Sequence, residues 1–276
     1  MKTKEERYKR IELKELQSII LSSMKDIHSF CVKHNIQYYC IAGTVLGAVR
    51  HGGFIPWDDD IDIAMTRENY ERFRALFSNY YTDKYFLQDY RSDNDFGLAL
   101  MRVCIKGTYI DWPAQNHLRN CKCAYIDIFP LDNVPENEKL QREQERSIKL
   151  LNKLCHLKLY KVGETRNIIN FIGKLFIHIL LKVVPLQMLV RMKEMIMTAY
   201  DDRPSEYICS MQSHYSYKKQ TISRSVYGSP TLIRFEDTHF FAPEHCDIYL
   251  NKLYGNYMEL PPVEKRTKKS NAYITV

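Results

Sequence analysis

Apolar residues recur at steps of three and four along residues 7–34, which predicts an amphipathic helix near the start of the chain. The apolar stripe of this helix consists of Leu13, Leu16, Ile20, Met24, Ile27 and Cys31. Residues 37–42 are aromatic and apolar and lead to Gly43, so we predict a strand that ends in a tight turn. A short helix is expected after the turn, over residues 44–50.

Three later apolar segments are predicted as strands, over residues 61–65, 98–105 and 124–129. Pro130 is expected to end the third strand, because proline has no N–H group to donate to a sheet. After the first of these strands, aromatic residues recur at helical spacing, and we predict a second amphipathic helix there. Its aromatic side comprises Tyr70, Phe73, Phe77 and Tyr80.

The chain changes character after Pro135. Residues 136–160 are charged and have a helical period, whereas residues 167–200 are far more apolar and contain Pro185, which should break the helix. The longest uncharged runs are shorter than the roughly 20 residues that a membrane span needs, so we expect no transmembrane helix. This part of the chain is therefore predicted to be a helical insertion.

Short apolar segments return after residue 205. They cover residues 207–211, 221–227 and 232–235. We expect Pro243 to open a helix that continues to Tyr254, followed by a polar, basic tail from Lys265. Strands early, helices in the middle and strands again predict an α+β fold, in which a mixed sheet has flanking helices and a helical insertion.

The composition of the 276-residue chain is that of a globular protein, with 45% hydrophobic and 26% charged residues. These fractions exclude a disordered chain, a collagen-like repeat and a coiled coil. A net charge of +7 is compatible with a nucleic acid, an anionic lipid or a phosphorylated small molecule as partner. We expect no nucleic-acid partner, because the basic residues lack the interleaved aromatic residues of single-strand binders.

Eight cysteines occur without the paired spacing of a zinc ribbon or a redox motif, and Cys121 and Cys123 are too close in sequence for a zinc knuckle. We interpret the cysteines as reduced, small hydrophobic residues. The first 17 residues contain no apolar core of a secretory signal. Both observations predict a protein of the reducing cytoplasm.

Lys174, His178 and Lys182 form a basic stripe at helical spacing within an otherwise apolar segment. One hypothesis is that this helix lies against the inner face of a membrane as a peripheral contact. The alternative is a core helix whose long basic side chains reach the solvent. The sequence leaves both interpretations open.

The most informative segment is an acidic run that enters the strand predicted over residues 61–65. In an extended chain Asp60 and Asp62 project from one face, whereas Ile61 and Ile63 project into the core. Two such carboxylates lie about 6.6 Å apart along the backbone and can bend toward one cation. Hard oxygen ligands are those that magnesium prefers. The alternative is a solvated acidic turn.

Two further features favour the metal interpretation. Gly43 and Thr44 lead into a helix, where backbone N–H groups can bind a phosphate. Asp127 lies between two isoleucines, so strand alternation turns it away from the core like Asp62. If the two strands are neighbours, Asp127 completes the metal site and accepts a proton from an attacking hydroxyl group.

The run from Ile41 to Asp62, IAGTVLGAVRHGGFIPWDDDID, resembles the signature of the LicD family of phosphotransferases. Two more segments resemble the family: YIDIFPLD at residues 125–132, and YLxxLYGNYM at residues 249–258 with the LPP that follows. Asn256 departs from the family pattern, which has Asp in many relatives. The resemblance covers the chain from about residue 36 to residue 262, apart from residues 136–205.

The resemblance implies a nucleotidyltransferase-like mixed sheet. Residues 1–135 would form the catalytic core with its N-terminal helix. Residues 136–205 would be the helical insertion, which contacts the acceptor or a membrane. Residues 206–276 would pack back on the core.

The resemblance also implies the site residues. Asp60 and Asp62 would hold Mg²⁺ or Mn²⁺, with Asp127 as third ligand or catalytic base and Asp58 as a secondary candidate. The implied substrate-binding residues are Gly43, Thr44 and Arg50. Gly43 and Thr44 would contact the donor phosphate, and Arg50 would contact pyrophosphate oxygens. An alternative role for Arg50 is to cap the end of its helix.

The implied reaction transfers a phospho-alcohol, phosphocholine or similar, from a CDP-activated donor to a hydroxyl group of a cell-surface glycan or its lipid-linked precursor. A choline donor needs an aromatic cage for its ammonium group. Twenty tyrosines, including Tyr38, Tyr39, Tyr109 and Tyr125, could build one, and the sequence does not assign it. Ribitol, glycerol and ethanolamine donors stay open. The alternative activities are nucleotidyl transfer from a nucleoside triphosphate with release of pyrophosphate, and nucleotide or surface binding without turnover.

Overall fold

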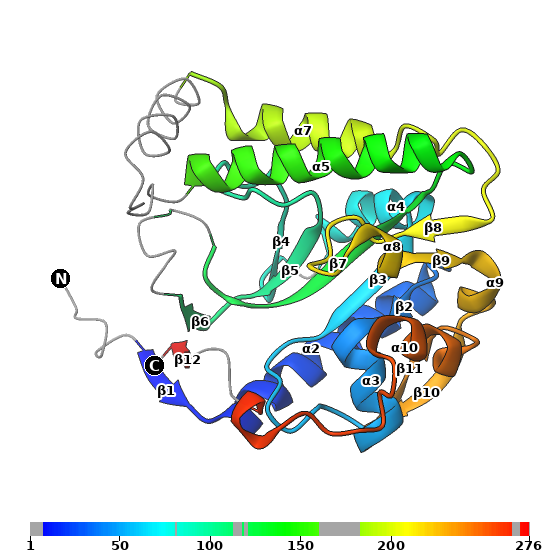
Figure 1. Ribbon diagram of the computed structural model, residues 1–276. Helices are drawn as coiled ribbons and strands as arrows, with labels where there is room; N and C mark the ends of the chain where they lie inside the picture. The colour runs from blue at the N-terminus through cyan, green and yellow to red at the C-terminus, as the bar shows by residue number, and fades with distance from the viewer. Residues whose placement is uncertain are drawn as a thin grey trace.

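The computed structural model describes residues 8–80, 82–112, 118, 121–159, 183–266 and 271–275. Its main sheet has the strand order β2-β3-β7-β5-β4, and β8 and β9 extend it from the end of β7 (Figure 1). β3 and β7 run parallel, whereas the other neighbouring strands are antiparallel. The strands on the main path are Tyr39–Cys40 (β2), Asp62–Thr66 (β3), Ala124–Asn133 (β7), Met101–Ile105 (β5) and Tyr85–Gln88 (β4). The predicted α+β class with a mixed sheet is confirmed.

Three helices of the first half flank this sheet: Leu13–Lys33 (α2), Ala42–His51 (α3) and Arg67–Phe77 (α4). The predicted stripe of α2 is buried from Leu16 onward, and α4 buries three of the four expected aromatic residues. These faces meet the isoleucines of β3 and β7 in one hydrophobic core. Helical spacing in the sequence therefore located the helices that pack on the sheet.

Two long helices, Glu138–Leu159 (α5) and Leu186–Met197 (α7), pack side by side at the top of Figure 1. They enclose a second apolar core, which includes Ile148, Leu189 and Val190. Pro185 directly precedes α7, as predicted. The basic stripe of Lys174, His178 and Lys182 lies outside the described residues.

The last part of the chain returns to the sheet through short elements. They are Tyr207–Cys209 (β8), Tyr217–Gln220 (α8), Thr221–Ser223 (β9), Arg224–Tyr227 (α9), Thr231–Phe235 (β10), Thr238–Ala242 (β11), Cys246–Tyr254 (α10) and the 3₁₀ turn Val263–Lys265 (η2). β10 and β11 form a hairpin, and α10 packs against α3. The segment that follows α10 thereby lies next to α3.

A small antiparallel sheet, which the sequence patterns did not predict, joins distant parts of the chain. Its order is β1-β12-β6, with Tyr8–Ile11 (β1), Asn271–Thr275 (β12) and Thr108–Asp111 (β6). β12 lies in the segment expected to be only a polar, basic tail. Its pairing partners are remote in sequence, so local patterns carry little sign of it.

Three local predictions are corrected by the structure. β7 does not end at Pro130 but continues to Asn133. The pairing of β7 with β5 ends at Ile128, so no residue of β5 requires a hydrogen bond from the N–H group that Pro130 lacks. Gly43 lies inside the first turn of α3 and not in a tight turn before it. The helix expected from Pro243 begins only at Cys246.

Within the described ranges, none of the helices has the length and apolar character that a bilayer crossing requires.

Candidate active site

A cavity of about 760 Å³ opens between the start of β3, the first turn of α3 and the segment after α10. Four carboxylates line it: Asp58, Asp60, Asp62 and Asp127. The cavity therefore contains the three predicted metal residues, Asp60, Asp62 and Asp127. Of the predicted phosphate-binding residues, Gly43 and Arg50 line it and Thr44 does not.

Asp62 and Asp127 are register partners on the parallel strands β3 and β7. The backbone N–H of Asp127 donates to the carbonyl oxygen of Ile61 at 3.1 Å, which fixes this register at the entrance of the strands. Ile63 and Ile128, the next residue on each strand, are fully buried on the opposite face. Alternation thus directs the carboxylates of the pair to the same side of the sheet, as the sequence predicted.

Arg102 on β5 holds Asp127 from its other side. Its Nε donates to Oδ1 of Asp127 at 2.6 Å, and its Nη2 lies 3.4 Å from Oδ2. The guanidinium stacks over the ring of Tyr125 at 3.9 Å and faces Phe96 at 5.3 Å. Burial by itself lowers the pKa of Arg102, but the Asp127 carboxylate outweighs it and raises the pKa above its ordinary value. No sequence pattern pointed to Arg102.

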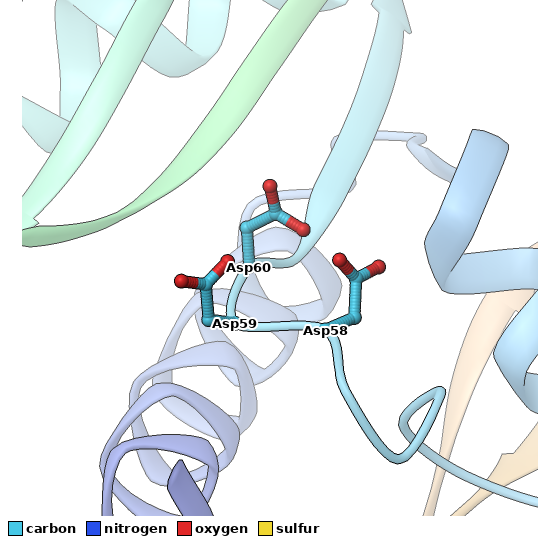
Figure 2. A group of neighbouring side chains, drawn as sticks. All are labelled: Asp58, Asp59 and Asp60. Carbon is cyan, nitrogen blue, oxygen red and sulfur yellow. The ribbon is translucent and has the colours of Figure 1, made fainter. Parts of the chain in front are cut away.

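The tightest group of carboxylates lies just before β3. Asp58, Asp59 and Asp60 each offer an oxygen atom within 4.8 Å of the others, and in the described part of the chain no other three acidic, histidine or cysteine residues do so. Figure 2 shows them on the loop next to α2, with all three carboxylates pointing to the same side. Asp60 precedes β3 and does not lie within it. Asp59 was not among the predicted site residues.

Gly43 permits a close contact between this loop and α3. A Cβ atom at Gly43 would lie 2.9 Å from Oδ2 of Asp58, so no larger residue fits without displacing that carboxylate. The loop is fixed from behind by Gln17 of α2, whose amide donates to the carbonyl oxygen of Asp58 at 2.8 Å. The carboxylate of Asp58 therefore occupies the position beside the first turn of α3 at which we predicted an anion.

Thr44 has a structural contact. Its side chain is buried, and its Oγ1 accepts a hydrogen bond from the backbone N–H of Asp62 at 2.8 Å. The hydroxyl group thus fixes the start of β3 and the backbone that carries Asp62. Its predicted contact with the donor phosphate stays a prediction.

Arg50 connects α3 to residues 256–262, which form one wall of the cavity and are called the covering segment below. Its Nη1 donates to the carbonyl oxygens of Tyr257 at 2.8 Å and Glu259 at 3.2 Å. Its Nε donates to the ring of His51 at 3.0 Å. Arg50 thereby holds the covering segment in place and also lines the cavity.

The aromatic lining of the cavity includes three of the twenty tyrosines, but none of the four that were named as examples for an ammonium cage. Tyr38 and Tyr39 are buried in the main core, Tyr109 stacks in the small sheet, and Tyr125 stacks under Arg102. None of these four lines the cavity. Its aromatic lining consists of Trp57, Phe129, His214, Tyr215, Tyr254 and Tyr257.

Comparison with known proteins agrees with this geometry. Residues 35–152 match the family model described as "LicD/FKTN/FKRP, nucleotidyltransferase domain". The chain is 26% identical over 267 residues to the lipopolysaccharide cholinephosphotransferase LicD of Haemophilus influenzae, covering 93% of this chain and 95% of that protein. It is 33% identical over 140 residues to the uncharacterized protein RP689 of Rickettsia prowazekii, covering 51% of this chain and 45% of that protein.

The mixed sheet, the acidic cavity and the family match together define a transferase built on a nucleotidyltransferase domain. The chain is similar to the LicD family, whose model matches residues 35–152.

Proposed function

We propose that the protein transfers phosphocholine, or a similar phospho-alcohol, from a CDP-activated donor to a hydroxyl group of a lipopolysaccharide or related cell-surface glycan, or of its lipid-linked precursor. The observation that carries this proposal is the register pair of Asp62 and Asp127 at one cavity. It occurs in a chain that aligns over 93% of its length with a lipopolysaccharide cholinephosphotransferase.

The carboxylates fit Mg²⁺ or Mn²⁺ by their chemistry, because all are hard oxygen donors. Asp60 belongs both to the predicted metal set and to the compact group with Asp58 and Asp59. We assign Asp60 and Asp62 to the metal, with Asp58 and Asp59 as the adjoining oxygen donors. A bound divalent ion neutralises charge on the donor diphosphate.

Asp127 is assigned to the acceptor hydroxyl group. Arg102 holds Oδ1 at 2.6 Å and Oδ2 only at 3.4 Å, so Oδ2 is the oxygen that can accept a proton. The acceptor oxygen forms the new bond to the phosphorus of the phospho-alcohol. The bond from that phosphorus to the bridging oxygen breaks, CMP leaves with the electron pair, and the hydroxyl proton moves to Asp127.

The covering segment contributes by excluding water. Arg50 fixes it at the carbonyl oxygens of Tyr257 and Glu259, and Arg266 donates to the carbonyl oxygen of Pro261 at 2.8 Å. A wall held in place next to the acidic residues limits the access of water, which favours transfer to a sugar hydroxyl over hydrolysis of the donor.

Product analysis by mass spectrometry tests the proposal. The purified protein is incubated with Mg²⁺, a panel of CDP-alcohols and nucleoside triphosphates, and a lipopolysaccharide extract. We expect CMP release and a phospho-alcohol on the glycan, both lost in Asp60→Asn. Asp237→Asn, at an exposed carboxylate outside the cavity, is the matched control and should keep full activity. Pyrophosphate release would instead support the nucleotidyltransferase alternative and overturn the proposal.

A further inference from the structure

Tyr215 and Tyr254 form a right-angled aromatic corner in the wall of the cavity. Their ring centroids lie 5.7 Å apart and their planes are inclined at 90°. Tyr254 is the last residue of α10, and Tyr215 lies in the segment before α8. Both tyrosines line the cavity.

We propose that this corner binds the quaternary ammonium group of a choline-bearing donor, an inference that rests on the proposed function. A trimethylammonium group cannot donate a hydrogen bond, so aromatic faces are its natural partners. Each ring face carries negative charge density, and two perpendicular faces enclose the methyl groups from two sides. The corner thereby selects choline over neutral alcohols such as ribitol or glycerol.

The position of the corner within the cavity supports this assignment. Tyr254 is partly buried against the main core, which raises the pKa of its hydroxyl, and Tyr215 and Asp62 raise it further. Asp62 is thus near enough to act electrostatically on Tyr254. Asp62, which is assigned to the metal, and the aromatic corner line the same cavity. One phosphocholine could therefore place its phosphate near the metal and its ammonium group at the corner.

The ring of His214 packs against that of Tyr215, with centroids 4.1 Å apart, and covers one face of this tyrosine. The remaining aromatic residues of the cavity have partners outside the corner. The hydroxyl of Tyr257 donates to Asp247, and the guanidinium of Arg266 lies over the ring of Trp57 at 5.6 Å. Phe129 is buried in the main core. The corner of Tyr215 and Tyr254 is therefore the part of the aromatic lining best suited to a cation.

The test compares the binding of CDP-choline with that of its neutral isostere, in which carbon replaces the ammonium nitrogen. Calorimetry on the intact protein with Mg²⁺ measures both affinities. We expect the wild type to prefer CDP-choline about tenfold. Tyr254→Leu and Tyr215→Leu should each remove that preference while the affinity for the isostere changes little.

Tyr254→Phe and Tyr215→Phe are the matched controls, because they keep the ring and remove only the hydroxyl. Both should retain the preference for choline. Tyr273→Leu, in the small sheet, controls for the loss of a tyrosine elsewhere. Circular dichroism checks that each variant is folded. Because Tyr215 and Tyr254 are replaced separately, each gives its own measurement of the preference for choline.

Several outcomes overturn the inference. It fails if wild type binds the isostere as tightly as CDP-choline, or if both Leu variants keep the preference. It also fails if they weaken both ligands equally. In these cases CMP release from any CDP-alcohol would still support the proposed phosphotransfer. If the protein binds no CDP-alcohol but binds nucleoside triphosphates, the proposed function itself fails.

Discussion

Arg102 and Asp127 are register partners on the antiparallel strands β5 and β7, and their side chains form an ion pair with an Nε to Oδ1 distance of 2.6 Å. Asp127 is at the same time the register partner of Asp62 on β3. A cation and two carboxylates therefore stand in one row across three strands. Arg102 is the member of this row that fixes the orientation of Asp127.

Replacing Arg102 tests that role. Arg102→Met leaves the Asp127 carboxylate poorly solvated without its partner, so we expect a loss of about 3 kcal/mol in the free energy of unfolding. Turnover should fall about 100-fold, because the assigned base loses its orientation. Urea unfolding and the CMP assay measure the two effects. The double variant Arg102→Met with Asp127→Leu should regain stability but not activity. If Arg102→Met turns over normally, Arg102 does not position Asp127.

The metal assignment is tested by single carboxylate-to-amide changes, which keep side-chain shape. Asp60→Asn and Asp62→Asn should preserve the fold, weaken Mn²⁺ binding at least tenfold and abolish metal-dependent turnover. Asp59→Asn should weaken Mn²⁺ binding less. Electron paramagnetic resonance of Mn²⁺ gives the affinities. If Asp59→Asn proves the most damaging, the compact group of Asp58, Asp59 and Asp60 is the metal site and Asp62 is not a ligand.

Two glycines of α3 provide a matched comparison. A Cβ atom at Gly43 would meet the side-chain oxygen of Asp58 at 2.9 Å, whereas one at Gly47 would meet the backbone oxygen of Gly53 at 2.4 Å. A side chain can move aside more easily than backbone. We therefore expect Gly43→Ala to reduce activity with a stability change under about 1 kcal/mol, and Gly47→Ala to cost about 2 kcal/mol or more of stability. Thermal unfolding and the CMP assay separate the two outcomes.

Lys193 on α7 predicts a pH dependence of stability. It is fully buried and donates to the carbonyl oxygen of Gly97 at 3.1 Å and to Oδ1 of Asn152 at 2.9 Å. Burial lowers its pKa to about 8, against a smaller opposing effect of Cys155. Between pH 8 and its ordinary pKa of 10.5, the unfolded chain binds more protons than the native state, so stability rises with pH.

The measurement compares wild type with Lys193→Met, so that other titrating groups cancel. The free energy of unfolding of the wild type should gain about 2 kcal/mol relative to the variant between roughly pH 7 and pH 9.5. Below pH 7 the difference in the free energy of unfolding between wild type and Lys193→Met should be constant. A difference that stays flat across the whole range would contradict the lowered pKa of Lys193.

The hypothesis of membrane contact remains a prediction of the sequence, because its residues lie outside the described ranges. The double variant Lys174→Glu with Lys182→Glu should abolish flotation with anionic vesicles at low salt. Lys149→Glu with Lys153→Glu, on α5, is a control of equal charge change. If wild type does not float at all, the alternative of a core helix is favoured.

Periodicity predicted the helices α2, α4 and α5 because each buries a stripe against a neighbouring element, and such stripes are visible in local sequence. It also directed Asp62 and Asp127 away from the core, because each lies between two isoleucines that are fully buried. The pattern left open whether their two strands are neighbours. The parts that it missed depend on distant partners. β12 pairs with strands more than 150 residues away, a relationship that no local pattern expresses.

In the site, too, the features that the sequence did not predict depend on partners distant in sequence. Arg102 was missed because its strand gives no sign of which acidic residue it will face. The sequence could not assign an ammonium cage, because twenty tyrosines are spread along the chain. Tyr254 reaches the cavity because α10 packs on α3, and Tyr215 reaches it from the segment before α8. Tyr254 does lie within the YGNYM segment that resembles the family, and that was the available signal.

Correct folding and catalytic activity both depend on the register between β3 and β7. If either strand shifted by a single residue, its isoleucines would face the cavity and its aspartate would enter the core. The misaligned chain would lose its activity and its stability together. Errors of pairing at this site are therefore removed by unfolding, and a folded but inactive population should not accumulate from this source.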